Sequence, residues 1–358
     1  MVNAQLILAP VGAGKTEFVL NELQRHYTQN PFARIWVLLA TQRQEVALRE
    51  RLFRAEGDDT YFNIEFFNFS TLYQRLLDMA GNPQRMMNKQ GQAVLLRHLI
   101  HHLDLPVFES VAHTHGFVRI VENWIEELKS NRVNADDYKR VASTPREHDL
   151  AQIYETYQHA LIDHRLMDEE GQGWLAVEAL QARPNLLSHA RVDVLIVDGF
   201  DQFSHTQTDL LAHIAKQVPQ LLITLTQVSG REATIGRRFS IAKTELEGAF
   251  DRLGEDLTIT PIGVAPTTKH PDLSHLVHTI FSRGSKKGAI TDGITFLEAP
   301  TLADETANVL RHVKQALLNG AKPDDILIAV RDWGNYRPHL SAYAEKYRLP
   351  IVLHYDEP

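Results

Sequence analysis

Cysteine is absent from this sequence of 358 residues. Without a thiol the chain can form no disulfide, and it offers no thiolate ligand to zinc or to an iron–sulfur cluster. Proteins of the reducing cytoplasm commonly lack disulfides. We therefore expect a cytoplasmic protein.

Long apolar runs are also missing. The first one, Leu6–Ala9, is far shorter than the roughly 18 residues that a membrane-spanning helix needs, and no basic stretch precedes it as in a secretion signal. The sequence therefore predicts neither a membrane partner nor an export signal.

Positive charge is scarce as well, since the formal net charge is −8 and the isoelectric point lies near 6.1. A small basic module that coats nucleic acid would have an isoelectric point above about 9, so this class of protein is excluded. A local basic groove for DNA remains compatible with an acidic chain, because only the phosphates in contact must be neutralised.

Continuous apolar segments of strand length indicate the fold class. Because they do not alternate with polar residues, they predict strands buried on both faces, as in a parallel sheet covered by helices. The chain is also too long for one domain of roughly 100 to 200 residues, so we expect two or three domains. The predicted strands of the first domain are Gln5–Ala9, Ile35–Ala40, Ile64–Phe69, Val192–Val197 and Leu221–Thr226.

Helical periodicity without a convincing strand fills the part from Thr71 to Gln181, which predicts an all-helical insertion in the α/β domain. Residues 231–293 mix glycine, proline and charged residues and are interpreted as irregular, with a linker near 285–288. A βαβαβ pattern follows, and since three strands make only half a domain, we expect the natural polypeptide to continue beyond Pro358. The predicted elements of this pattern are Ile294–Glu298, Asp304–Leu318, Ile326–Val330, Tyr336–Tyr347 and Ile351–His354.

A glycine-rich loop joins the first predicted strand to a helical pattern. Gly12 and Gly14 allow the backbone to turn its N–H groups toward an anion, and the helix N-terminus that follows adds partial positive charge. Lys15 is predicted to reach the β- and γ-phosphates of ATP and Thr16 to bind Mg²⁺, although the loop has Ala9 where the P-loop pattern begins with glycine. The predicted ATP-binding residues are Pro10, Val11, Gly12, Ala13, Gly14, Lys15 and Thr16.

An acidic residue closes the apolar strand Val192–Val197. Asp198 follows this strand at its carboxyl edge, where α/β sheets bind ligands, and it is predicted to hold Mg²⁺ through water. The next residue is Gly199, where superfamily 1 motors have a glutamate as general base, so we predict nucleotide binding with slow hydrolysis. Asp201 is the candidate substitute for this base.

Several segments resemble the AddB/RexB-type family of bacterial ATP-dependent helicase/nuclease subunits, which are relatives of UvrD-like superfamily 1 helicases. Val197–Phe203 resembles the degenerate D-G-F-x-x-F motif of that family, and Phe67–Leu72 resembles its S-F-x-x-L stretch. Further similarity lies in Trp36–Phe53, Trp124–Lys129, Asp149–Leu161 and Ala299–Arg331.

This resemblance implies a RecA-like P-loop domain at 1–82 and 188–288, a helical insertion at 83–187, and the start of a second RecA-like domain at 289–358. It also implies a subunit that processes DNA double-strand-break ends for recombinational repair, together with a partner helicase/nuclease subunit. The C-terminal nuclease of the family has no matching motif in this sequence. By position, Arg337 corresponds to the arginine that reaches the γ-phosphate in the helicase relatives.

The resemblance also indicates where DNA would bind. Thr41, Gln42 and Ser70 occupy strand ends that face single-stranded DNA in the helicase relatives, and we predict DNA contacts for them and for Arg43. Further basic residues near 49–54 and 231–243 are candidates, with an ordinary solvated surface as the alternative.

Two other functions remain open. The chain could be the front of an active superfamily 1 helicase whose general base comes from elsewhere, in which case DNA would stimulate rapid ATP turnover. A P-loop kinase for a small molecule is the third interpretation, but such kinases are usually shorter and lack a second βαβαβ unit. The 18 histidines show no ligand spacing with carboxylates, so we predict no histidine metal site.

Overall fold

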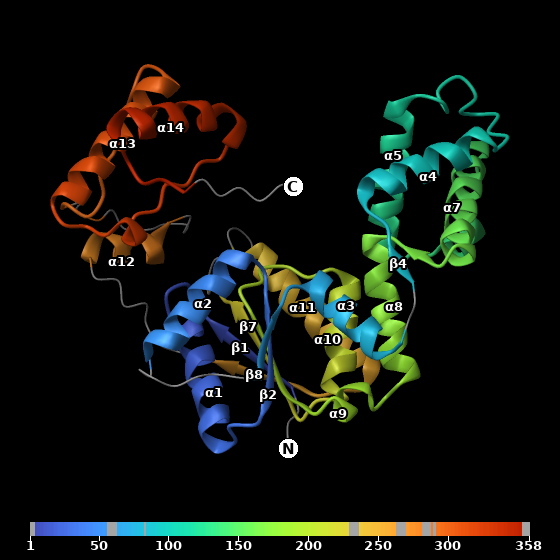
Figure 1. The fold of residues 1–358 in the computed structure, drawn as a ribbon, viewed down its shortest axis with the longest axis horizontal. Coiled ribbons are helices and arrows are strands. Elements are labelled where there is room, and N and C mark those ends of the chain that lie inside the picture. Colours follow the sequence, from blue (N-terminus) through green and yellow to red (C-terminus); the bar gives the residue numbers. More distant parts are fainter. Residues whose placement is uncertain are drawn as a thin grey trace. The chain divides into compact units, whose positions relative to one another are not determined.

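The computed structural model describes residues 4–55, 63–81, 84–228, 236–262, 270–280, 288 and 291–352 (Figure 1). The chain forms two compact units, one of Met1–Lys269 with Val277–Lys286 and the other of His270–Leu276 with Lys287–Pro358. No helix among the described residues has the length and apolar character that crossing a bilayer requires.

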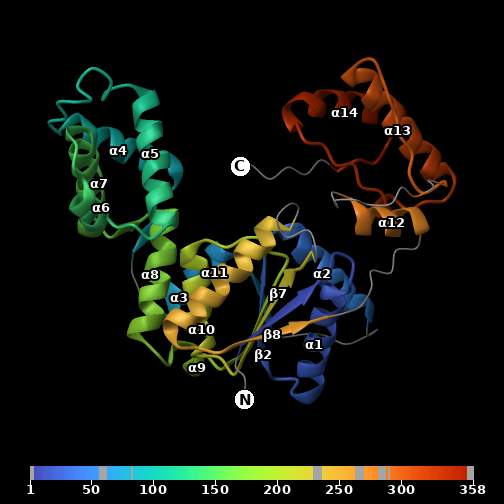
Figure 2. The ribbon, with the colours of Figure 1, turned by 180° about the vertical axis from the view of Figure 1, so that it is seen from behind.

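A six-stranded sheet lies at the centre of the first unit, and all its strand pairs are parallel (Figures 1 and 2). This confirms the predicted α/β class and the five predicted strands, with one correction. The third strand ends at Phe67, because Asn68 caps the next helix by accepting a hydrogen bond from the Thr71 amide at 2.9 Å. Across the sheet the strands are β3 (Ile64–Phe67), β2 (Arg34–Leu39), β6 (Val192–Asp198), β7 (Gln220–Thr226), β1 (Ala4–Ala9) and β8 (Leu257–Pro261).

Helices cover both faces of this sheet, as continuous apolar strands require. Along β2, Ile35 and Val37 enter one buried cluster, whereas Trp36 and Leu38 enter another on the opposite face. Burial of each such side chain contributes roughly 1.5–3 kcal/mol, so both faces stabilise the sheet. The first face is covered by α1 (Lys15–Gln29) and α2 (Gln42–Ala55). The second is covered by α3 (Phe69–Met79), α8 (Glu169–Ala182), α9 (Leu186–His189), α10 (His205–Ala215) and α11 (Arg237–Leu253).

The region predicted as irregular, 231–293, contains three ordered elements, α11, β8 and α12 (Pro271–Thr279), so that prediction was wrong in part. Helix α11 buries Ala242, Leu246 and Phe250, whose helical spacing is hidden in the sequence by the many charged residues around them. Strand β8 pairs with β1 at the edge of the sheet, and it ends in Pro261, which has no N–H to offer a further strand. The predicted linker at 285–288 lies outside the described residues except for Gly288.

The helical segment between β3 and β6 has a hydrophobic core of its own. Side chains such as Ile125, Tyr154 and Tyr157 form this core, which is separate from the clusters on the sheet. A two-residue strand pair, β4 (Arg85–Met86) with β5 (Leu166–Met167), corrects the expectation that the segment is entirely helical. The helices that contribute to this core are α4 (Lys89–His101), α5 (His115–Ser130), α6 (Ala135–Val141) and α7 (Pro145–Asp163).

The second unit has the predicted helices but not the predicted strands. Helix α13 (Leu302–Leu318) ends before Gly320, whose φ of 94° allows the expected left-handed turn, and α14 (Trp333–Tyr347) packs against it. The rest of the described unit contains residues 271–276 of α12 (Pro271–Thr279) and a 3₁₀ turn, Pro323–Asp325.

The segments 294–298 and 326–330 form no ladder, because the described part of this unit offers no neighbouring strand for their backbone groups. In the second of these segments the side chains still alternate, since Ile326, Ile328 and Val330 are half-buried while Leu327 is exposed. The predicted strand Ile351–His354 is likewise not formed at 351–352, and 353–354 lie outside the described residues.

Candidate functional site

The glycine-rich loop makes a tight turn between β1 and α1. Gly12 and Gly14 have φ angles of 77° and 87°, in the left-handed region that glycine adopts without steric cost. The Ala13 amide donates to the Pro10 carbonyl at 3.2 Å and closes the turn. The seven predicted ATP-binding residues, 10–16, therefore lie together in this turn and at the start of α1.

The first turn of α1 combines free donors with positive charge. Its N-cap, Gly14, provides no side-chain cap, so the first amides of the helix can receive an anion. The Lys15 ammonium donates only long hydrogen bonds, at 3.4 Å to the Ala9 carbonyl and 3.3 Å to the Pro10 carbonyl. Burial lowers the pKa of Lys15, and the charge of Asp198 partly opposes that shift.

Asp198 is the last residue of β6 and is 7% exposed. Its Oδ1 accepts a short hydrogen bond from the Thr224 hydroxyl on β7, the strand that separates β6 from β1. Two strand spacings place Asp198 about 10 Å across the sheet from the start of the loop, within electrostatic reach of Lys15. Thr224 was not predicted, because the order of the strands in a sheet cannot be read from a single sequence.

Hard oxygen donors of the kind that Mg²⁺ prefers are thus present on both sides of the site. Thr16 is half-buried in the first turn of α1, and the Asp198 carboxylate keeps one oxygen that makes no hydrogen bond to a described residue. The donor set fits a metal held partly through water, with Thr16 and Asp198 as the residues that would hold it.

The two positions considered for a general base, 199 and 201, each lie against a side chain from a helix elsewhere in the sequence. Gly199 has a φ of 85°, and a Cβ built on it would lie 2.5 Å from the Gln44 side chain. Asp201 forms a short ion pair with Arg238 of α11, and both side chains are substantially exposed. The carboxylate proposed as a substitute base is therefore occupied by a guanidinium.

The predicted DNA contacts lie along the same edge of the sheet. Thr41, Gln42 and Arg43 follow β2, which neighbours β6, and Ser70 follows β3, which neighbours β2, so all four lie beyond the carboxyl ends of these strands. Gln42, Arg43 and Ser70 are exposed, whereas the Thr41 hydroxyl accepts from the Gln44 amide at 3.3 Å and caps α2. The edge of one sheet thus presents the nucleotide candidates and the DNA candidates side by side.

The remaining basic candidates are mostly engaged by acids. Arg49 pairs with Glu45 at 2.7 Å on α2, and Lys243 lies 3.5 Å from Glu247 on α11. Arg337 lies on α14 in the second unit, so its predicted contact with the γ-phosphate stays a prediction. Arg231 lies outside the described residues.

Aromatic packing joins two of the motif segments. Phe200 and Phe203, from the segment after β6, stack with ring centroids 5.3 Å apart. Phe69, at the start of α3, meets the Phe200 ring edge to face at 5.1 Å. These contacts hold the turn after β6 against the turn after β3, and they explain the two phenylalanines of the D-G-F-x-x-F pattern.

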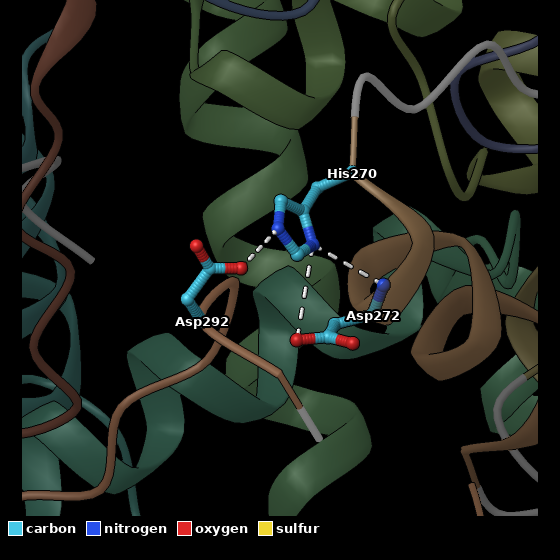
Figure 3. A group of neighbouring side chains, drawn as sticks. All are labelled: His270, Asp272 and Asp292. Atoms are coloured by element: carbon cyan, nitrogen blue, oxygen red, sulfur yellow. Dashed lines mark hydrogen bonds and ion pairs between the residues drawn. The ribbon is translucent and has the colours of Figure 1, made fainter. Parts of the chain in front are cut away.

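A second polar cluster lies in the other unit and was not predicted. His270, Asp272 and Asp292 bring one ligand atom each within 4.8 Å of one another, and Figure 3 shows the imidazole between the two carboxylates. His270 Nδ1 accepts a hydrogen bond from the Asp272 amide at 3.2 Å. His270 Nε2 donates a hydrogen bond to the Asp292 carboxylate at 2.9 Å. Asp272 Oδ2 accepts from the Thr291 amide, the Thr291 hydroxyl and the Gly293 amide at 2.9–3.0 Å. The cluster thus satisfies itself and ties the start of α12 to residues 291–293.

Replacing Asp272 with alanine should release the amides of Thr291 and Gly293, and hydrogen exchange would measure this. Because each lost hydrogen bond is modest, we expect their exchange to accelerate roughly threefold to tenfold at neutral pH. Asp292→Ala is the matched control, since the Asp292 side chain is 91% exposed and accepts neither amide. Unchanged exchange in Asp272→Ala would contradict the assignment.

The stabilisation that these hydrogen bonds to Asp272 provide should decrease at low pH. Burial alone would raise the pKa of Asp272, but the hydrogen bonds from Gly293 and Thr291 outweigh it and hold the pKa below its ordinary value of 3.8. The stabilisation is therefore fully present above pH 3.8 and is lost as the pH falls through the lower folded-state pKa.

The fold and the site together define an α/β protein whose candidate residues gather at the carboxyl edge of a parallel sheet, the usual ligand edge of such sheets. Residues 6–244 match the protein family described as "ADDB, N-terminal", and the chain belongs to this family. The family inferred from the motifs is thereby confirmed.

Proteins named as the B subunit of an ATP-dependent helicase/deoxyribonuclease are similar to this chain over nearly its whole length. The protein of Bacillus subtilis (strain 168) is 22% identical over 98% of the chain, and that of Geobacillus kaustophilus (strain HTA426) is 23% identical over 100%. The protein of Listeria innocua serovar 6a is 20% identical over 98%. The chain spans about a third of the length of these curated relatives, 31–32% in each case.

Proposed function

We propose that this chain is the ATP- and DNA-binding N-terminal part of an AddB-type helicase/deoxyribonuclease protein that acts in the repair of DNA double-strand breaks. Its first unit is proposed to be a RecA-like domain, and the naming of its relatives as B subunits supports a partner helicase/nuclease subunit. The observation that carries the proposal is the turn at Gly12 and Gly14, which leads Lys15 into the uncapped start of α1 on the side of the sheet where Asp198 ends β6.

In this proposal the chain binds Mg²⁺–ATP, and its own residues define what each part does. The amides of the first turn of α1 and the Lys15 ammonium would neutralise the phosphates. Thr16 and Asp198 would hold the metal, which on binding supplies charge neutralisation between the phosphates. Thr41, Gln42, Arg43 and Ser70 would contact single-stranded DNA at the neighbouring strand ends.

Slow hydrolysis is part of the proposal. Gly199 offers no side chain to activate water, and Asp201 is engaged by Arg238. A general base typically contributes about 10²- to 10⁴-fold to a rate. The proposed role is therefore that of a nucleotide-binding protein with a degenerate motor.

The expected result is clear nucleotide binding with very little turnover. We expect the chain to hydrolyse Mg²⁺–ATP at least roughly 100-fold more slowly than the median enzyme rate of about 10 s⁻¹, with or without single-stranded DNA. Phosphate release and fluorescent-nucleotide titration on the same sample would measure both quantities. Asp201→Ala tests the substitute base, because it should leave the residual rate unchanged.

Two outcomes would contradict this function. Rapid turnover stimulated by DNA would identify an active helicase motor. Absence of nucleotide binding at millimolar Mg²⁺–ATP would show that the proposed ATP-binding function is wrong.

A further inference from the structure

Gln44 connects the segment proposed to contact DNA with the turn next to the proposed metal ligand. It lies in the first turn of α2, where its side-chain Oε1 accepts from the Thr41 amide at 3.1 Å. Its Nε2 donates to the carbonyl of Gly199 at 3.3 Å, across 155 positions of sequence. One amide group therefore contacts both strand ends, that of β2 and that of β6.

The conformation of Gly199 is what admits this contact. Atoms of the Gln44 amide lie 2.5–2.6 Å from the point where a Cβ on Gly199 would be, so no other residue fits there without displacing Gln44. The positive φ of 85° is a second reason for glycine at this position. Gln44 thus occupies the space in which a side chain at 199 would begin.

The chemistry of an amide limits what Gln44 can do there. A carboxamide donates and accepts hydrogen bonds, but it does not take up a proton near neutral pH as a general base does. Its bond to the Gly199 carbonyl instead links the β2–α2 turn to the peptide group between Gly199 and Phe200, one residue after Asp198. A shift of the Thr41 backbone would move Gln44 and, through the Gly199 carbonyl, the turn that positions the Asp198 carboxylate.

We propose that Gln44 is a positioning residue that couples single-stranded DNA at Thr41–Arg43 to the nucleotide at Lys15 and Asp198. The inference rests on the proposed function and adds to it the connection between the two ligands. Such coupling is reciprocal, so DNA should change nucleotide affinity by the same factor as nucleotide changes DNA affinity.

A capping role alone is the alternative explanation for Gln44. The Gln44 amide donates to the Thr41 hydroxyl while the Gln44 side chain accepts from the Thr41 amide, which is the reciprocal arrangement of a capping box. A glutamate at position 44 can make both hydrogen bonds of the capping box. Its carboxylate, however, has no hydrogen to donate to the Gly199 carbonyl. Gln44→Glu therefore keeps the cap and removes the bridge, whereas Gln44→Ala removes both.

The experiment measures a thermodynamic cycle on the 358-residue chain with a non-hydrolysable ATP analogue, Mg²⁺ and an oligodeoxythymidine single strand. For the unchanged chain we expect each ligand to alter the affinity for the other by roughly 5- to 150-fold, the usual range of coupling. For Gln44→Glu and Gln44→Ala the coupling factor should fall to within about twofold of unity while each ligand alone binds within about threefold of normal. Only Gln44→Ala should lower the midpoint of thermal unfolding, by roughly 2–8 °C, because only it loses the cap.

The possible failures are distinguishable. If the unchanged chain binds both ligands and Gln44→Glu retains the full coupling factor, or if the unchanged chain shows no coupling, Gln44 is a capping residue only and the inference is overturned. If the unchanged chain binds no nucleotide, the proposed function fails and this inference fails with it.

Discussion

Replacing Lys15 with alanine is expected to weaken nucleotide binding by roughly 10- to 100-fold. A hydrogen bond to a charged group contributes about 1.5–3 kcal/mol, and the Lys15 ammonium is the cation at the turn between β1 and α1. Its present bonds to the Ala9 and Pro10 carbonyls are long, so little is lost when it turns toward a phosphate. Titration with a fluorescent ATP analogue in the presence of Mg²⁺ would measure the change.

The control for this variant lies on the same helix. Arg25 is an exposed residue of α1 whose guanidinium is paired with Glu22 at 2.6 Å. Arg25→Ala removes the same charge from the same element and should leave nucleotide affinity unchanged. Equal affinity of Lys15→Ala and the unchanged chain would mean that the loop does not bind phosphate.

Removing the carboxylate of Asp168 should destabilise the first unit by about 3–5 kcal/mol, because it leaves a buried ammonium without its partner. Asp168 accepts from Lys129 at 2.7 Å, from the Tyr157 hydroxyl at 2.9 Å and from the Gly171 amide at 2.7 Å. The side chains of the ion pair are only 1% and 3% exposed. Burial, reinforced by the charge of Asp168, raises the pKa of Tyr157, so its hydroxyl remains a proton donor across the ordinary pH range.

Denaturant unfolding of Asp168→Ala would measure this loss, and two further variants give the comparison. Glu155→Ala breaks an exposed pair with Lys139 on the same group of helices, and it should cost no more than about 1 kcal/mol. The double variant Lys129→Met with Asp168→Leu removes both charges, and it should recover part of the lost stability, since the Tyr157 hydroxyl and the Gly171 amide still lack their acceptor. A loss below about 1 kcal/mol in Asp168→Ala would show that the pair is not sequestered from water.

The local parts of the site could be predicted from the sequence because each depends on a short segment. The strand before Pro10, the two glycines and the helix after Lys15 form one continuous pattern, and the structure shows the turn that this pattern predicts. The apolar run ending at Asp198 likewise predicts a buried strand from its own composition.

The remaining features depend on contacts between distant segments. The hydrogen bond from Thr224 to Asp198 requires that β7 lie beside β6, and the fit of Gln44 against Gly199 requires that β2 lie beside β6. A single sequence contains no signal for either adjacency. The strands predicted at 294–298 and 326–330 failed for a related reason, since apolar composition cannot supply the neighbouring strand that a ladder needs.

Helix α8 has a mechanical consequence for the first unit. Its first residues meet α5 through the Lys129–Asp168 pair and the Trp174 indole, while Ala176, Val177 and Leu180 further along enter the core on the sheet. A helix shared in this way joins the two hydrophobic cores without an intervening loop. Movement of the helical segment relative to the sheet would therefore require breaking contacts that α8 makes in one of the two cores.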